Sequence, residues 1–219
     1  MPRARDSLWS TFHAWPLASS ALILLWSSGA AAATNTFAVD ASASSVLVHV
    51  GKTGIGSFAG HEHDVVAQSL RGEVVADFDD LSRSSLDISV NARSLKVTGR
   101  DEPEEDVPKV QQAMTGPKVL DAARFPGIRF RSREVASRRL SPGLYDLLVT
   151  GDLSLHGATK TMTIPIRLEV RDDTLTGIGT MVVKQTDFGI EPVVAAGGLV
   201  KVEDEVTVSF RIVARAGTP

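Results

Sequence analysis

Apolar and polar residues alternate with a period of two over most of the chain after residue 33, and this pattern constrains the fold more than any other feature. The clearest example is residues 163–171, with the sequence TIPIRLEVR, and the same alternation is found in residues 206–212. Because successive side chains of a β-strand point to opposite faces, the pattern predicts strands with one buried and one solvated face. The chain is therefore expected to be an all-β protein.

Turn signals rich in Gly, Pro and Asp separate the alternating segments. Further strands are expected at residues 45–50, 70–78, 86–90, 144–155 and 174–186, with a short first strand at 37–39, which gives about eight in all. Ile128 and Phe130 alternate with Arg129, Arg131 and Arg133. This spacing predicts a row of guanidinium groups on the outer face of the sheet.

Residues 103–123 break the two-residue period, because their apolar residues recur at helical spacing. Three acids, Glu104, Glu105 and Asp106, stand at the start, where a helix dipole favours negative charge. The pair Gly116-Pro117 interrupts the segment. We expect one or two short helices inserted between strands.

No linker, repeat or change of composition divides residues 34–219, so they are expected to form one domain. Closing an antiparallel sheet into a barrel removes its exposed edges. A barrel of about eight strands is wide enough to be filled by side chains or to hold one slender ligand. Gly177 and Gly179, on one face of a strand, leave room inside or mark a bend. At this point a packed core and a ligand cavity both remain open.

Residues 1–33 have the layout of a cleavable signal peptide. Arg3 and Arg5 precede an apolar stretch of about ten residues, which is followed by small residues up to Ala33. That stretch is too short to cross a bilayer core, which needs about 20 residues. All three Trp lie in this leader, and the chain has no Cys, which excludes a lipid-anchored cysteine and a thioredoxin-like motif. A periplasmic or secreted protein is expected.

Charge excludes one class of partner. The chain has 23 Lys and Arg against 26 Asp and Glu, a net charge of −3. Binding to a nucleic acid backbone depends on cationic side chains that displace counterions, so a nucleic acid partner is not expected.

Five short motifs occur in order along residues 34–219. They are VDASASSV at 39–46, RDE at 100–102, LDAARFPGIRF at 120–130, TGDLSLHGATK at 150–160 and TDFGI at 186–190. In this order and spacing, the chain resembles the YceI family of secreted polyisoprenoid-binding proteins. It departs from the family at Ala43, where a His is usual, and in residues 102–114, which are longer and more acidic than usual.

The resemblance implies a single lipocalin-like antiparallel barrel that encloses the tail of an isoprenoid lipid or quinone. Such a protein is a carrier or store rather than an enzyme and requires no cofactor. The residues expected to line the tunnel are Val48, Val50, Ile128, Phe130, Leu147, Val149, Leu153, Ile166, Leu168, Met181, Val208 and Phe210. Phe188 either touches the ligand or plugs the barrel end. A transient contact with a membrane or membrane protein and a homodimer are left open.

The segment GHEHD at residues 60–64 carries the alternative function. His61 and His63 are two residues apart and can share one face, and His is a common ligand of divalent metals. Completion of a site would require Asp64, His49 or His156. This predicts either a periplasmic metal-binding module built on His61 and His63, or a polar loop whose imidazoles cap backbone groups.

Catalytic motifs are lacking in the sequence. There is no Gly-x-Ser-x-Gly elbow, no phosphate-binding glycine loop and no paired Cys ligand motif. His156-Gly157 is expected at a hairpin corner, and the acids between Asp101 and Asp106 on a solvated face. Hydrolysis of lipid-like substrates is a third, disfavoured hypothesis. Residues 193–200 are small and apolar and suit a flap over the barrel opening or an ordinary loop.

Overall fold

The computed structural model describes residues 34–54, 62–100 and 103–217. The expected signal peptide therefore lies outside the described residues. The strands are β1 (Thr34–Val39), β2 (Ser45–Thr53), β3 (His63–Ala67), β4 (Leu70–Asp77), β5 (Ser85–Asn91), β6 (Leu95–Val97), β7 (Gly127–Ser141), β8 (Leu144–Leu155), β9 (Ala158–Arg171), β10 (Thr174–Lys184), β11 (Val194–Ala195) and β12 (Val200–Ala216). The helices are α1 (Val107–Thr115) and the 3-10 turns η2 (Leu81–Arg83), η3 (Ala92–Ser94), η4 (Gln185–Phe188) and η5 (Ala196–Gly198).

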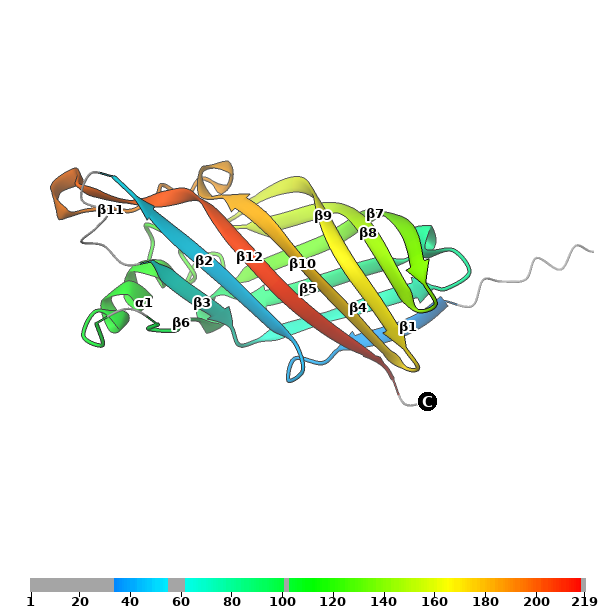
Figure 1. The fold of residues 1–219 in the computed structure, drawn as a ribbon. Coiled ribbons are helices and arrows are strands. Elements are labelled where there is room, and N and C mark those ends of the chain that lie inside the picture. The colour runs from blue at the N-terminus through cyan, green and yellow to red at the C-terminus, as the bar shows by residue number, and fades with distance from the viewer. Residues whose placement is uncertain (1–33, 55–61, 101–102, 218–219) are drawn as a thin grey trace, which may run out of the picture. The chain divides into compact units, whose positions relative to one another are not determined.

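The sheet is antiparallel and closes on itself, as the alternation predicted. Its closed circuit of eight strands runs β1, β4, β5, β7, β8, β9, β10, β12 and back to β1. The closing contact pairs Phe37 with Ala216 and Val39 with Ala214, so the first strand of the domain bonds to the last. Figure 1 shows the long strands wrapping around one interior. The expected all-β barrel is confirmed.

Three positions in the barrel wall are each occupied by two consecutive strands in place of one continuous strand. β2 follows β1 along the same edge of β12, β3 pairs with β2, and β6 pairs with β3. The pairs β1/β2, β3/β4 and β5/β6 thus each behave as one long strand with an interruption. When each pair is counted as one strand, every strand of the wall lies next to the strand that follows it in the sequence. This topology is an up-and-down meander.

Three of the strands were not predicted. β3 overlaps the histidine segment, for which a metal site or a polar loop was expected, and β6 has only three residues. β11 lies in residues 193–200, for which a flap or an ordinary loop was expected. Residues 103–123 hold the single helix α1, which ends at Gly116, and turns follow it at 117–120. Among the described residues, no helix has the length and apolar content needed to cross a bilayer.

The free edge of β6 is covered by a side chain of α1. The Val97 N–H donates to Gln111 Oε1 at 2.9 Å, and Gln111 Nε2 donates to the Leu95 carbonyl at 2.9 Å. The carboxamide thereby satisfies two backbone groups as a neighbouring strand would. This contact fixes α1 at one end of the barrel.

A β-bulge in β7 keeps two large side chains inside the barrel. The register with β8 shifts between Ser132 and Glu134, so Phe130 and Val135, five residues apart, both face inward. Without the extra residue, strict alternation would turn one of them to solvent. Each pairs with an inward residue of β8, Leu153 or Val149.

Ion pairs cover the outer wall. Arg129 pairs with Asp87, Arg133 with Asp152 at 2.6 Å, and Asp146 stands between Arg138 and Arg167 at 2.6 and 2.5 Å. These arginines are more than half exposed, which confirms the predicted row of guanidinium groups. Hydrogen bonds from them lower the pKa of Asp146, and the Arg129 guanidinium does the same for Asp87.

Candidate binding cavity

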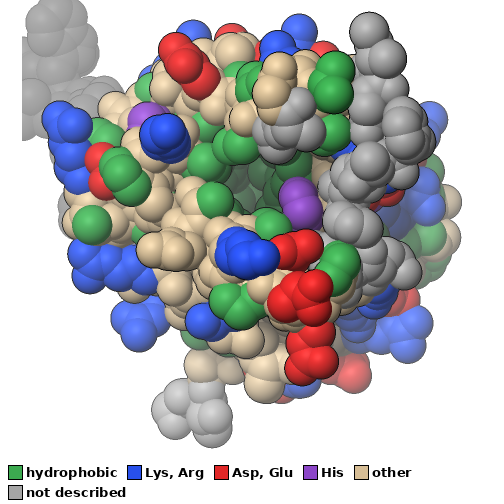
Figure 2. Space-filling view, turned by 90° about the vertical axis from the view of Figure 1, so that its left-hand side faces the viewer, with side chains coloured by type: hydrophobic (Ala, Val, Ile, Leu, Met, Phe, Trp, Pro, Cys, Tyr) green, Lys and Arg blue, Asp and Glu red, His purple; other side chains and the backbone are tan. Residues whose placement is uncertain are grey.

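The interior of the barrel is hollow and apolar. It contains a cavity of about 320 Å³, at the lower end of the range of small-molecule sites. Among the described residues, only three polar side chains line it, those of Ser84, Ser85 and Gln185, and no charged residue does. Figure 2 looks into the end at which α1 and β11 lie, where hydrophobic side chains surround a recess and charged side chains stand on its rim.

Most of the residues predicted to line a tunnel line this cavity. Eleven of the thirteen do so: Val48, Val50, Ile128, Phe130, Leu147, Leu153, Ile166, Leu168, Met181, Val208 and Phe210. They come from β2, β7, β8, β9, β10 and β12. Their contact with a lipid stays a prediction.

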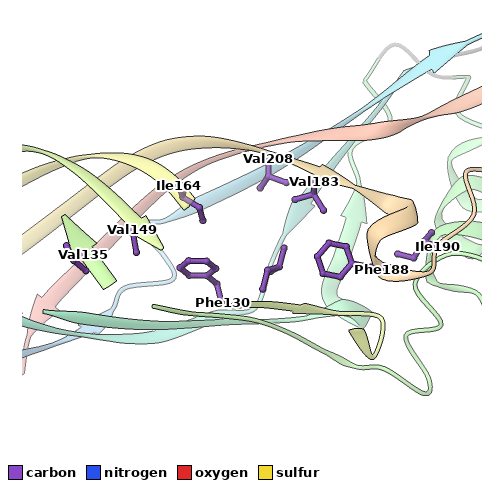
Figure 3. Packing of buried hydrophobic residues seen from close by; sticks show 9 residues of the cluster. Phe130, Val135, Val149, Ile164, Val183, Phe188, Ile190 and Val208 are labelled. Carbon is purple, nitrogen blue, oxygen red and sulfur yellow. The ribbon is translucent and has the colours of Figure 1, made fainter. Parts of the chain in front are cut away.

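The other two predicted residues are buried away from the cavity surface. Val149 is 0% exposed and packs in the hydrophobic cluster that also contains Phe130. Phe188 is 3% exposed and belongs to η4, at the end of the barrel. Figure 3 shows Phe130 and Phe188 in the interior with another side chain of the cluster between them, and Ile190 beyond Phe188. Phe188 is thus a buried side chain of the barrel interior, and which of its two expected roles it has stays a prediction.

Sequence reasoning missed one side of the lining. The additional lining residues include Val65, Ala67, Leu70, Val74, Ala76, Leu86, Ile88, Val90 and Leu95 from β3, β4, β5 and β6, and Met114, Val119 and Leu120 from α1 and the turn after it. The alternation of Leu86, Ile88 and Val90 in an expected strand was a usable signal. The run Val74-Val75-Ala76 is apolar at every position, so its sequence does not indicate which side chains point into the barrel.

The glycines predicted to leave room inside differ in what they do. A Cβ on Gly177 would meet only Ile166 Cγ2 at 3.4 Å, and this residue lines the cavity. A Cβ on Gly179 would stand 2.5 Å from Phe210 Cζ, and one on Gly151 would stand 2.6 Å from Phe130 Cζ. The phenyl rings therefore lie close to Gly179 and Gly151, and of these three glycines Gly177 is the one that lines the cavity.

Several hydrogen bonds hold η4 in the barrel end. His156 Nδ1 lies 3.0 Å from the Phe188 carbonyl oxygen, and Gln185 Nε2 donates to the Glu203 carbonyl at 2.7 Å. The Thr186 N–H and hydroxyl donate to the Asp204 carboxylate at 2.9 and 2.7 Å, and these bonds lower the pKa of Asp204. The turn η4, which carries Phe188, is thus anchored to the β8–β9 turn and to β12.

The anchors depend on two local backbone features. His156 and Gly157 have φ values of 50° and 77°, which suit a tight two-residue hairpin turn, so the expected hairpin corner is confirmed. In β12, the register with β2 shifts between Val202 and Val206. The resulting bulge presents Glu203 and Asp204 to η4.

At the opposite end of the barrel, η2 lies beneath the cavity. Leu81 of η2 lines it, and the buried Asp77 holds the turn by accepting from the Asp79 and Asp80 N–H groups at 3.0 Å. Arg83 Nε lies 2.8 Å from the Asp77 carboxylate. Burial opposes ionisation of Asp77, but the Asp80 amide and the Arg83 guanidinium outweigh it, so its pKa is lowered.

A second cleft lies in the wall between β9 and β10. Within the described strands, the register of this pair ends at Gly179 opposite Ile166. Beyond that point is a cleft of about 440 Å³, lined by residues of β9, β10, η4 and β12, among them Phe188 and Val183. Val183 lines the main cavity as well. The cleft and the cavity therefore share Val183 in their walls.

The histidine segment does not assemble a metal site in the described part of the chain. His49 Nδ1 lies 2.9 Å from Asp64 Oδ1 and its Nε2 lies 3.6 Å from Glu62 Oε2. His63 pairs with Val50, which lines the cavity, so His63 lies on the opposite face of the wall from His49 and Asp64. Among the described residues, no three His, Cys, Asp or Glu side chains could hold a metal ion. His61 lies outside them, so its role stays a prediction.

The apolar lining of the cavity is suited to binding a hydrophobic ligand by removing it from water. Within the part of the chain that the structure describes, the cavity surface offers methyl, methylene and phenyl groups, with hydroxyls only at Ser84 and Ser85 and an amide at Gln185. No acid, base or ion pair of the described chain reaches this surface. A ligand would therefore be held by the hydrophobic effect rather than by specific polar contacts.

A family model and similar solved structures both relate this chain to YceI-like proteins. A family model, the YceI-like domain, matches residues 37–214. The structure of BcnA from Burkholderia cenocepacia is similar, with a TM-score of 0.61 and 20% identity, over 80% of this chain and 98% of BcnA. A YceI protein of Campylobacter jejuni has a TM-score of 0.53 and 12% identity, over 70% of this chain and 85% of that protein. The comparison with curated proteins found no match.

Proposed function

Since the chain belongs to the YceI-like family, we propose that it is a binding protein that holds the tail of a polyisoprenoid, an isoprenoid quinone or a similar long-chain lipid inside its barrel. It acts as a carrier or store, and no catalytic step is assigned to it. The family and the closed barrel support a lipid-binding barrel. That the lipid is a polyisoprenoid, an isoprenoid quinone or a similar long-chain lipid is part of the proposal.

One observation carries this proposal: the cavity is lined almost without interruption by aliphatic and aromatic side chains. Each methylene moved from water to such a surface contributes about 0.8 kcal/mol. A long hydrocarbon tail can thus be bound tightly with few polar contacts. A polar or charged ligand would leave its own hydrogen-bonding groups unsatisfied there.

We further propose that the protein acts in the periplasm or outside the cell. The leader pattern of residues 1–33 and the absence of Cys support this. Cleavage near Ala33 would remove every Trp and leave Tyr145 as the strongest near-ultraviolet absorber. Exported protein should lack Trp fluorescence, and a strong Trp signal would contradict cleavage.

The cargo is tested by native mass spectrometry of protein purified from its own compartment, followed by organic extraction and lipid identification. A stoichiometric long-chain lipid is the expected result. Protein that is empty under these conditions and does not take up an isoprenoid lipid in vitro would overturn the proposal. Bound metal in place of lipid would favour the His61 and His63 alternative.

A pair of variants tests whether the cavity holds the lipid. Met181→Glu places a carboxylate on the cavity surface, and retention of lipid should be lost. Val182→Glu adds the same charge to the next residue of β10, which is 51% exposed, and retention should be unchanged. Val149 is a poor position for this test, because a charge at a fully buried site tests folding instead. Equal retention by the two folded variants would exclude the cavity as the site.

A further inference from the structure

Exposed apolar side chains gather on one hairpin of the barrel. We name residues 193–201, which contain β11, η5 and the start of β12, the rim hairpin. Val193, Val194 and Leu199 are 39%, 56% and 56% exposed. Eight large hydrophobic side chains are exposed in the described part of the chain, and three of them lie within the nine residues of the rim hairpin. The others are Phe78, Leu140, Leu148, Ile178 and Val182.

The rim hairpin stands beside the mouth of the cavity. β12 leads from it to Val206 and Val208, which line the cavity, and Ile190, just before it in sequence, lines the cavity too. Lys201 pairs with Thr53 at the end of β2. In Figure 1, β11 lies at the end of the barrel that also holds α1, away from the C-terminus. The hairpin is therefore an apolar extension of the wall at the open end.

From this placement we infer that the rim hairpin docks the protein on a lipid bilayer, with Val193, Val194 and Leu199 inserted among the headgroups. The inference rests on the proposed function, because a long-chain lipid is taken from and returned to a membrane. Moving such a tail through water would expose every methylene at a cost of about 0.8 kcal/mol each. Contact between the mouth and the bilayer avoids that exposure.

A bilayer fits this hairpin better than a protein partner does. A stable protein interface buries roughly 800 Å² on each side, far more than three half-exposed aliphatic side chains can supply. Interfacial insertion, in contrast, needs only a short apolar element that reaches roughly 5–10 Å into the headgroup region. The hairpin tip leaves space around it, since a Cβ on Gly197 or Gly198 would meet no atom within 4 Å.

Charges around the hairpin indicate that apolar insertion drives the contact. Lys201 lies opposite Val194, and Lys52 opposite Val202 at its base, where ammonium groups can reach lipid phosphates. Glu191 and Glu203 are exposed along the same stretch and offset them. Docking should therefore occur on zwitterionic phosphatidylcholine and should change little with salt.

Flotation with phosphatidylcholine vesicles tests the inference. The rim variant is Val194→Asp with Leu199→Asp. The matched control is Leu148→Asp with Ile178→Asp, which adds the same charge to wall residues that are 54% and 49% exposed. The rim variant should lose about tenfold or more of the vesicle-bound fraction, and the control should float like the wild type. Equal flotation of the rim variant and the wild type, or an equal loss in the control, would overturn the inference.

Cargo retention separates this inference from the proposed function. Both double variants leave the cavity surface unchanged, so both should retain long-chain lipid as the wild type does, while transfer from vesicles to empty protein slows only in the rim variant. A wild type that floats but never carries lipid would refute the carrier function. A wild type that carries lipid but never floats would refute the docking surface alone.

Discussion

The ring of Phe210 lies against the backbone of Gly179, the residue directly opposite it on the neighbouring strand. A Cβ at this glycine would stand 2.5 Å from Phe210 Cζ and 2.7 Å from the Pro165 carbonyl oxygen. The absence of a side chain at Gly179 therefore lets the Phe210 ring approach the backbone of β10 closely.

Gly179→Ala should destabilise the protein by about 1–3 kcal/mol, because the methyl group would displace the ring or the backbone of β9. Gly177→Ala, two residues earlier on the same strand, meets only an ordinary contact with Ile166. It should leave stability unchanged or raise it by up to about 1 kcal/mol, since alanine loses less entropy on folding. Urea unfolding of both variants gives the comparison, and equal midpoints would contradict the packing described.

Gln111→Leu should detach α1 from the edge of β6. The Val97 N–H and the Leu95 carbonyl would lose their partners, at a cost of about 1–3 kcal/mol. Gln112→Leu is the control, because Gln112 is exposed and lies on the same helix. Hydrogen exchange at Val97 should rise in the first variant only, and unchanged protection there would show that the carboxamide is not needed.

Asp40 should make the protein sensitive to acid. Hydrogen bonds from the Ser42 side chain and from Arg215, with others from backbone amides, lower the pKa of Asp40 to about 2. An ordinary Asp has a pKa of about 3.9, so the stabilisation is present above that pH and is lost as the pH falls through about 2. The urea midpoint should fall between pH 5 and pH 2 in the wild type, and by less in Asp40→Asn. Parallel pH profiles of the two proteins would exclude this role.

Phe188→Ala should loosen the packing of the barrel interior beside η4. The substitution deletes a ring that is 3% exposed and should cost about 3–5 kcal/mol. It should also join the cleft between β9 and β10 to the main cavity, so that bound lipid is released faster. Asp187→Ala, an exposed neighbour in η4, is the control. Release at the wild-type rate from a folded Phe188→Ala protein would show that other side chains retain the ligand.

Where alternation was strong and turns flanked it, the sequence was a sufficient guide. The strand expected at 144–155 coincides with β8, and strand facing identified eleven of the residues that line the cavity. Both follow from the two-residue period, which assigns every second side chain to the interior.

Prediction failed where a local feature interrupts that period. The bulge in β7 reverses the facing between Phe130 and Val135, and no residue type marks it in the sequence. β3 carries His63 on its inner face and Asp64 on its outer face, so the segment is polar on both sides and was not predicted as a strand. Ring positions over Gly151 and Gly179 depend on contacts between strands, which a single sequence does not reveal.

The contact of β1 with β12 also determines when the interior comes into existence. β12 comprises the 17 residues Val200–Ala216, and it pairs with β1, β2 and β10. Until β12 is in place, the sheet is open and has two unpaired edges. The barrel therefore cannot close before β12 has been made, and a chain that lacks β12 or is still unfolded has no enclosed space in which to trap a lipid prematurely.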